Sequence, residues 1–175
     1  LHVFRPCDAI ETAECWELAI RRTDGPSLLA LSRQNLPALR YDAAMKSALG
    51  GYRLHGAIAA RQVVLVATGS EVSLACEVAE MLEQGGVGAD VVSMPCTELF
   101  DAQDANYRND VLPKDALIVS IEAGVTLGWE RYTGRGGLNI GIDRFGASAP
   151  ASDLYDYFGL TAPKIYNQII EKLAV

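Results

Sequence analysis

Residues 62–94 read QVVLVATGSEVSLACEVAEMLEQGGVGADVVSM, and this stretch decides the fold class. The apolar run at 63–68 predicts a buried strand, and the apolar residues spaced along 69–84 predict a helix. Two glycines end that helix, and a second apolar run follows at 88–94. A strand, a helix and a strand in this order predict a parallel strand pair joined by a right-handed crossover.

The same alternation continues beyond this unit and predicts an α/β protein. We expect three layers, with a mostly parallel, mixed sheet and helices on both of its faces. This part of the chain has about 115 residues, so it can bury around two-thirds of its unfolded surface and fold alone. The later segments are PCTELFDAQ, ALIVSIEA, GVTLGWERYTG and LNIGI, followed by two helices after Pro150.

The first 35 residues predict one further βαβ unit. LHVF opens as a strand, and Asp8 with Glu11 three residues later is typical of a helix start. SLLALS at 27–32 predicts a fully buried strand, parallel to the first. One such unit cannot bury itself, and the sequence begins directly in a strand. We therefore expect this unit to belong to a truncated domain whose other strands lie upstream of residue 1.

No helix or strand period persists over residues 36–61. A Gly-Gly pair ends a short helical stretch there, and YRLH at 52–55 fits an antiparallel edge strand. We interpret most of this segment as an interdomain linker and expect limited proteolysis to cut within it. The expected division is residues 1–35 for the truncated domain, 36–57 for the linker and 58–175 for the second domain.

Composition excludes several classes of function. The formal net charge is −7, which disfavours nucleic acid and anionic membranes as partners, so an anionic ligand would need a local cationic site. No apolar stretch approaches the roughly 18 residues of a membrane span. The four cysteines show neither CxxC nor zinc-type spacing, so we expect reduced, partly buried thiols in a cytoplasmic protein and no metal site.

Two polar segments at predicted strand ends are candidate sites. ATGSEV at 67–72 could cradle an anion at a helix N-terminus, but its residues are also those preferred for helix capping, which we favour. It contains neither GxGxxG nor a P-loop motif. Glu122, in SIEAGVTLGW, could act as a general base or bind a partner's backbone, and we favour a capping or interface contact. His2 and His55 lie beside no Ser or Cys in a triad-like signature.

A third segment, RFGASAPASDLYDYFGL at 144–160, mixes Gly, Ser and Pro before an aromatic helix. Leu154, Tyr155 and Phe158 recur at helical spacing, which favours packing in the core or an interface. The alternative is an exposed docking face for another subunit.

Arg33, in SRQNLP, is the strongest candidate for binding a ligand. It follows a predicted strand, and ligands of open α/β sheets bind beyond the carboxyl ends of the strands. The planar fork of arginine suits phosphate or carboxylate, and Gln34 and Asn35 could add neutral donors. The alternative is a surface arginine that caps a loop or pairs with Asp24 or Asp42.

The sequence resembles the C-terminal quarter of the transketolase family. Six motifs carry the resemblance in order: SRQNLP, ATGSEV, VVSMPCTELFDAQD, VLP, IEAG and FGASAP. The resemblance implies that residues 1–35 are the tail of a pyrimidine-binding domain and residues 58–175 a C-terminal domain. It also implies a homodimeric enzyme of the pentose phosphate pathway that transfers a two-carbon ketol unit between sugar phosphates. Such an enzyme uses thiamine diphosphate and a divalent cation, Mg²⁺ or Ca²⁺.

Residue by residue, the resemblance transfers one role to this chain: Arg33 matches the arginine that binds the substrate phosphate. The family's GDG metal motif, the glutamate that activates the cofactor, the aromatic cofactor pocket and the substrate-binding histidines all precede this part. The resemblance therefore implies that this chain alone binds no cofactor or metal and is inactive.

Two alternatives remain at this level. Deoxyxylulose-phosphate synthase and the β subunit of 2-oxoacid dehydrogenases share the domain plan, although SRQNLP and FGASAP favour transketolase. A different class of function is an independent α/β module for dimerisation or for binding a regulatory ligand at ATGSEV.

Overall fold

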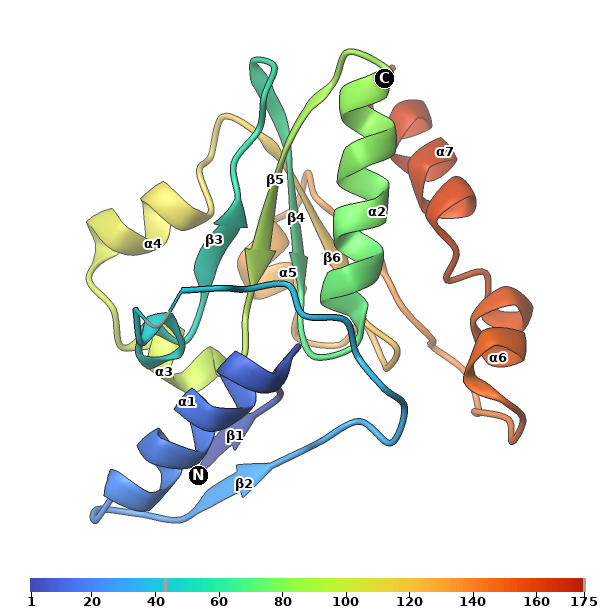
Figure 1. The fold of residues 1–175 in the computed structure, drawn as a ribbon. Coiled ribbons are helices and arrows are strands. Elements are labelled where there is room, and N and C mark those ends of the chain that lie inside the picture. Colours follow the sequence, from blue (N-terminus) through green and yellow to red (C-terminus); the bar gives the residue numbers. More distant parts are fainter. Residues whose placement is uncertain (43, 175) are drawn as a thin grey trace.

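The computed structural model describes residues 1–42 and 44–174, and its larger sheet has five strands in the order β3-β5-β4-β6-β7 (Figure 1). β3 is antiparallel to β5, and the other neighbouring strands are parallel. The bounds are β3 Tyr52–His55, β4 Arg61–Ala67, β5 Gly88–Ser93, β6 Leu117–Ile121 and β7 Leu138–Ile140. The prediction of a mixed, mostly parallel sheet is confirmed, as is the antiparallel strand at YRLH.

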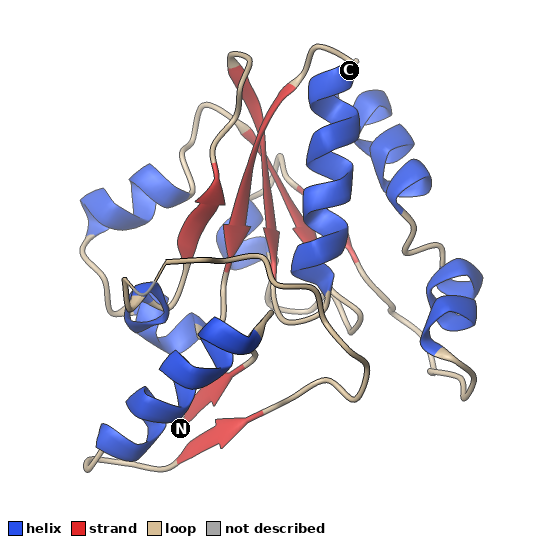
Figure 2. Ribbon diagram, viewed as in Figure 1, coloured by secondary structure: helices blue, strands red, loops and turns tan. Residues whose placement is uncertain are grey.

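β4 lies at the centre of three layers because its two faces are both apolar. Val63 and Leu65 belong to one buried cluster, which α2 and α7 cover, while Val64 and Val66 belong to a second cluster on the opposite face. Figure 2 shows α2 and α7 side by side in front of the sheet and α5 behind it. The helices are α2 Glu71–Gln84, α3 Thr97–Asp101, α4 Ala105–Val111, α5 Glu130–Thr133, α6 Ala151–Phe158 and α7 Ala162–Leu173.

The N-terminal βαβ unit consists of β1 His2–Phe4, α1 Ala9–Arg21 and β2 Ser27–Leu29, with the two strands parallel as predicted. It lies at the carboxyl edge of the large sheet (Figure 1). The backbone of Arg5 fixes it there: its N–H donates to Pro95 O over 2.8 Å, and its carbonyl accepts from Gly69 N–H over 3.0 Å.

The prediction that SLLALS forms a fully buried strand is wrong. β2 ends at Leu29, and Leu28 and Leu31 are 46% and 51% exposed. β2 pairs with β1 on one edge, and no other strand of the described residues pairs with it. A strand without layers on both faces leaves its side chains in solvent, which is why its apolar run does not become core.

α1 buries a polar face, whereas its sequence suggests an apolar one. Trp16 and Ile20 are exposed, and the buried residues include Glu11 and Glu14. The acids are tolerated because both accept several hydrogen bonds. Glu11 accepts from the Cys7 N–H at 2.7 Å, and its carboxylate also accepts from the hydroxyls of Tyr52 and Ser93. The predicted N-cap is confirmed, since Asp8 accepts from the Glu11 N–H at 2.8 Å.

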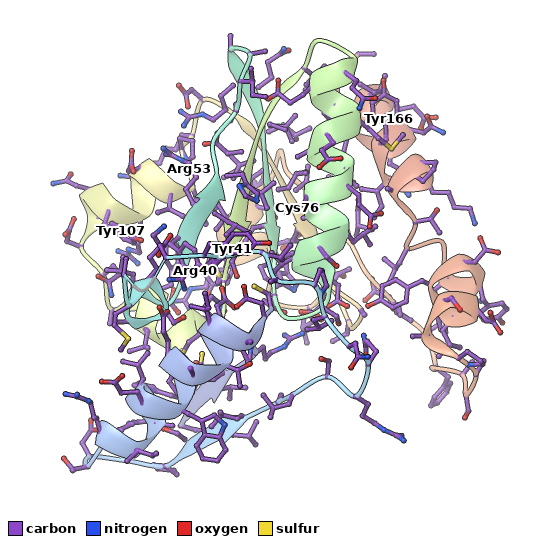
Figure 3. All side chains as sticks on the ribbon, viewed as in Figure 1. Arg40, Tyr41, Arg53, Cys76, Tyr107 and Tyr166 are labelled. Atoms are coloured by element: carbon purple, nitrogen blue, oxygen red, sulfur yellow. The ribbon has the colours of Figure 1, made fainter. Side chains whose placement is uncertain are left out.

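Part of the expected linker, at Leu39, Arg40 and Ser47, contacts α1 and its N-cap through hydrogen bonds. Asp8 Oδ2 accepts hydrogen bonds from the N–H groups of Leu39 and Arg40. The Arg40 side chain, labelled in Figure 3, is buried and donates to the Glu14 carboxylate. The segment also contains the 3₁₀ helix η1 Lys46–Leu49 and β3. The segment therefore contributes a strand to the larger sheet and also packs onto the first unit.

Gly50 ends η1 where no other residue fits. Its φ is 78°, in the left-handed region, and a Cβ there would lie 2.1 Å from the backbone nitrogen of Phe100.

The four cysteines are free thiols, and Cys7, Cys15 and Cys96 are buried, which confirms the expected partly buried thiols. None of the helices over 1–42 and 44–174 is long and apolar enough to cross a membrane.

Candidate site at the carboxyl edge of the sheet

The strand order places a topological switch point between β4 and β6. From β4 the chain crosses through α2 to β5 on one side, and from β5 it returns to β6 on the other side of β4. The connection that leaves the carboxyl end of β4 leads to β5, whereas the one that leaves β6 leads to β7 on the other side. The two connections therefore diverge, and this opens a crevice where such sheets bind ligands. A cavity of about 450 Å³ lies there. It is lined by Gly69–Glu71 after β4, Glu122 and Ala123 after β6, Arg5 and residues 30–32 of the first unit, and α6.

Glu122 forms an ion pair with Arg5 across the two units. The carboxylate is buried, and it also accepts a hydrogen bond from the Thr68 hydroxyl at 3.2 Å. A carboxylate held by a guanidinium and a hydroxyl is an interface contact, as favoured from the sequence.

ATGSEV does not cap α2 in the predicted way. Ser70 precedes the helix but forms no side-chain capping hydrogen bond; its hydroxyl donates to the Glu71 carboxylate at 2.8 Å. Glu71 also accepts a hydrogen bond from the Tyr155 hydroxyl, and burial raises the pKa of this carboxyl. The expectation of plain side-chain capping is wrong because the Ser70 backbone is already helical, with φ −61° and ψ −26°, and its hydroxyl is used by Glu71. The sequence carried no signal for the pair of Glu71 and Tyr155, whose members are 84 residues apart.

The aromatic helix α6 closes one side of the crevice. Tyr155 and Phe158 are partly buried against the main core cluster and line the cavity with Leu154. This confirms the packing interpretation of that segment. The preceding FGASAP loop is exposed, and its Phe145 side chain is fully exposed.

Arg33 lies on the rim of this region and does not line the cavity, although its neighbours Ser32 and Gln34 do. It is exposed and forms no ion pair within the described part of the chain. Asp24 instead pairs with Arg22 at 3.0 Å, and Asp42 pairs with Arg40 and Lys46. The alternative pairing of Arg33 with Asp24 or Asp42 is therefore wrong.

Fold and site together define a class of protein. The chain is an α/β protein in which a mixed sheet, covered on both faces, carries the end of a second α/β unit on its carboxyl edge. Loops of both units meet there around a small-molecule-sized crevice.

Comparison with known proteins identifies the family. The transketolase-like C-terminal domain model matches residues 50–161, and the transketolase pyrimidine-binding domain model matches residues 1–38. Because the first of these covers more than half of the chain, the protein belongs to the transketolase family.

Individual relatives agree with this assignment over nearly the whole chain. A Sinorhizobium medicae transketolase is 51% identical over 99% of this chain, and a plasmid-encoded Cupriavidus necator transketolase is 53% identical over 91%. A Pichia stipitis transketolase structure, in complex with sedoheptulose-7-phosphate, superposes with a TM-score of 0.91 and 38% identity over 99% of this chain. The chain spans about a quarter of each of these proteins: 25%, 24% and 25% of their lengths.

Proposed function

We propose that this chain forms the C-terminal part of an enzyme that transfers a two-carbon ketol unit between phosphorylated sugars, in the pentose phosphate pathway. The observation that carries the proposal is the match of nearly the entire chain to proteins named transketolase. The sugar phosphate in the Pichia stipitis complex supports this substrate class. Homodimerisation and a cytoplasmic location belong to the same proposal.

Within this enzyme, Arg33 would bind the phosphate of the sugar. Its exposed guanidinium has no acidic partner in the described part of the chain, so it can form charge-assisted hydrogen bonds with an incoming dianion. Ser32 and Gln34 on either side of it line the crevice, so Arg33 lies in a loop that borders the crevice. The proposed division into residues 1–35, 36–57 and 58–175 places Arg33 at the end of the pyrimidine-binding domain.

Thiamine diphosphate and a divalent cation, Mg²⁺ or Ca²⁺, would serve the full-length enzyme. The described residues do not fit the cation: within 1–42 and 44–174 no cluster of three or more His, Cys, Asp or Glu side chains could hold a metal. The buried carboxylates Glu11, Glu14 and Glu122 already accept hydrogen bonds from other side chains. We therefore propose that the cofactor is bound by other parts of the enzyme and that this chain alone is inactive.

A chimaera tests the proposed function. The C-terminal quarter of the Sinorhizobium medicae transketolase is replaced by residues 1–175, and ketol transfer from a ketose phosphate to an aldose phosphate is measured. A folded chimaera that transfers the ketol unit supports the proposal, whereas a folded, cofactor-loaded chimaera without transfer overturns it. Calorimetry of residues 1–175 with thiamine diphosphate and Mg²⁺ tests the second part, since saturable binding would contradict it.

The crevice favours a second candidate function, an independent module for dimerisation or for binding a regulatory ligand. A cavity of about 450 Å³ at the switch point is of the size used for small molecules. The chimaera distinguishes the two, because a module of independent function would not restore ketol transfer.

A further inference from the structure

A second cavity, of about 550 Å³, lies on the opposite side of the sheet from α2 and α7. Its walls come from α3, α4, α5 and the loops that lead into β6 and β7, so it shares no lining residue with the crevice. Phe100, Leu112 and Ile118 give it an apolar floor, and all three belong to the second core cluster. Tyr132 packs beside Phe100, with 6.1 Å between the ring centroids.

Three cationic side chains line this cavity in a chain whose net charge is −7. Arg108 comes from α4, Lys114 from the loop after it and Arg131 from α5. The cavity has one carboxylate, Asp101, which Arg131 already engages at 3.0 Å and which also accepts from the Tyr132 hydroxyl. The local charge is therefore opposite in sign to that of the whole molecule.

Arg108 and Lys114 have no carboxylate partner among residues 1–42 and 44–174. The Nε atom of Arg108 is buried without a hydrogen-bond partner. Nε of Arg40 is likewise buried without a partner, but the Arg40 guanidinium differs in that its Nη atoms pair with the carboxylates of Glu14 and Asp42. A half-buried guanidinium and an ammonium that line one cavity, with no carboxylate partner for either, form an arrangement that an anion would stabilise.

The loop TGRGG at 133–137 completes the wall. Gly134 has a φ of 70°, and a Cβ at Gly134 or Gly136 would meet nothing within 4 Å, so this backbone faces open space. The N–H groups of Gly134 and Gly137 are used within the loop and α5, whereas no hydrogen bond of the described residues uses the N–H of Gly136. A free amide that lines the same cavity as these cations adds a donor for an anionic oxygen.

We propose that this cavity binds a small organic phosphate with an apolar or planar body, such as a nucleoside monophosphate. The phosphate would lie on Arg108, Lys114 and the Gly136 amide, and the body would pack on Leu112 and Tyr132. The volume is within the range of small-molecule sites, and it exceeds what inorganic phosphate alone would fill. The proposal does not depend on ketol transfer, because Arg33 lies outside this cavity.

The test titrates residues 1–175, labelled with ¹⁵N, with AMP, adenosine and inorganic phosphate. We expect saturable AMP binding with shifts of the Gly134, Gly136 and Gly137 amides, and weaker binding of adenosine and of phosphate. Shifts confined to the Gly69 and Ser70 amides at the crevice would overturn the proposal. So would equal affinities for phosphate and AMP, or no saturation up to about 10 mM, which corresponds to negligible affinity.

Variants locate the phosphate. Lys114 is exposed, so Lys114→Ala removes one charge with little risk to the fold, and Arg108→Gln removes the other. Each should weaken AMP binding by about tenfold or more, as expected for a lost charge-assisted hydrogen bond. Lys164→Ala is the matched control, because Lys164 is a surface lysine paired with Asp156 outside the cavity. Unchanged affinity in both cavity variants, or the same loss in the control, would overturn the assignment.

Discussion

Arg40 and Glu14 form a bidentate ion pair that connects the segment after β2 to α1. Nη1 and Nη2 of Arg40 each lie 2.8 Å from an oxygen of the Glu14 carboxylate, and both side chains are buried. Ser47 adds hydrogen bonds from its N–H and its hydroxyl to the same carboxylate. The guanidinium also lies over the ring of Tyr52 at the start of β3, 5.1 Å from the centroid. One arginine thus contacts both units of the chain.

Arg40→Ala should destabilise the chain strongly. Removing one partner of a buried ion pair leaves the other charge uncompensated, at a cost of about 3–5 kcal/mol. Urea unfolding of residues 1–175 measures the loss. Arg21→Ala is the matched control, since Arg21 pairs with Glu17 at the surface, where its side chain is 75% exposed. The control should lose less than about 1 kcal/mol. Equal losses in the two variants would show that the Arg40 pair does not hold the units together.

The same pair should make stability depend on acid. Burial alone would raise the pKa of Glu14, but the hydrogen bonds from Arg40 and Ser47 outweigh it and hold the pKa below its ordinary value of 4.5. Because the folded state favours the ionised form, this contribution is present above pH 4.5 and is lost as the pH falls through the lowered pKa.

Unfolding free energies of the wild type and Glu14→Gln, measured from about pH 7 to about pH 3, check the sign. We expect a large difference near neutrality that shrinks below pH 4.5. Glu17→Gln, which removes the partner of a surface pair, should give a small difference throughout. A difference that grows on acidification would refute the assignment.

Trypsin should distinguish Arg33 from Arg40, although both lie in the segment after β2. Arg33 is exposed, whereas the Arg40 side chain is buried and its N–H donates to Asp8. Proteolysis requires local opening, so the bond after Arg33 should be cut first and the bond after Arg40 should be protected. Mass spectrometry of early digests identifies the cuts. In Arg40→Ala, Lys46 should become accessible as the segment loosens, whereas cleavage after Arg40 at the wild-type rate of Arg33 would contradict the packing.

The sequence predicted the elements of the large sheet because their signals are local. The apolar runs of β4 and β5 and the helical period of α2 lie within 33 consecutive residues. The N-cap Asp8 and the left-handed Gly50 follow from equally local rules.

The polar contacts that position the units and the site could not be predicted, because they join residues far apart in the sequence. Glu11 meets Ser93, Glu71 meets Tyr155 and Glu122 meets Arg5 over separations of 82, 84 and 117 residues. From sequence alone, an acidic residue in a helix is predicted to lie at the surface, because the partners that would allow its burial are not visible locally. For the same reason the sequence predicted a linker at Arg40, whose side chain is buried.

Arg33→Ala in the active chimaera should weaken turnover of phosphorylated sugars. The exposed guanidinium has no partner in the described residues, so its removal should leave the fold intact. A charge-assisted hydrogen bond contributes roughly 1.5–3 kcal/mol, so kcat/KM should fall by about 10 to 150-fold. Arg33→Lys should recover part of the loss, because it keeps the charge but not the planar fork.

The distribution of that loss identifies the phosphate as the group that Arg33 contacts. Phosphate binding remote from the reacting carbonyl should appear mainly in KM, unless its binding energy orients the sugar and so also raises kcat. Hydroxypyruvate, a donor without phosphate, provides the control and should react at nearly the wild-type rate with a non-phosphorylated acceptor. Cofactor affinity should also stay unchanged, since Arg33 is proposed to contact substrate only. If Arg33→Ala slows hydroxypyruvate and the sugar phosphates by the same factor in a folded chimaera, Arg33 does not bind phosphate, and a loop-capping role takes its place.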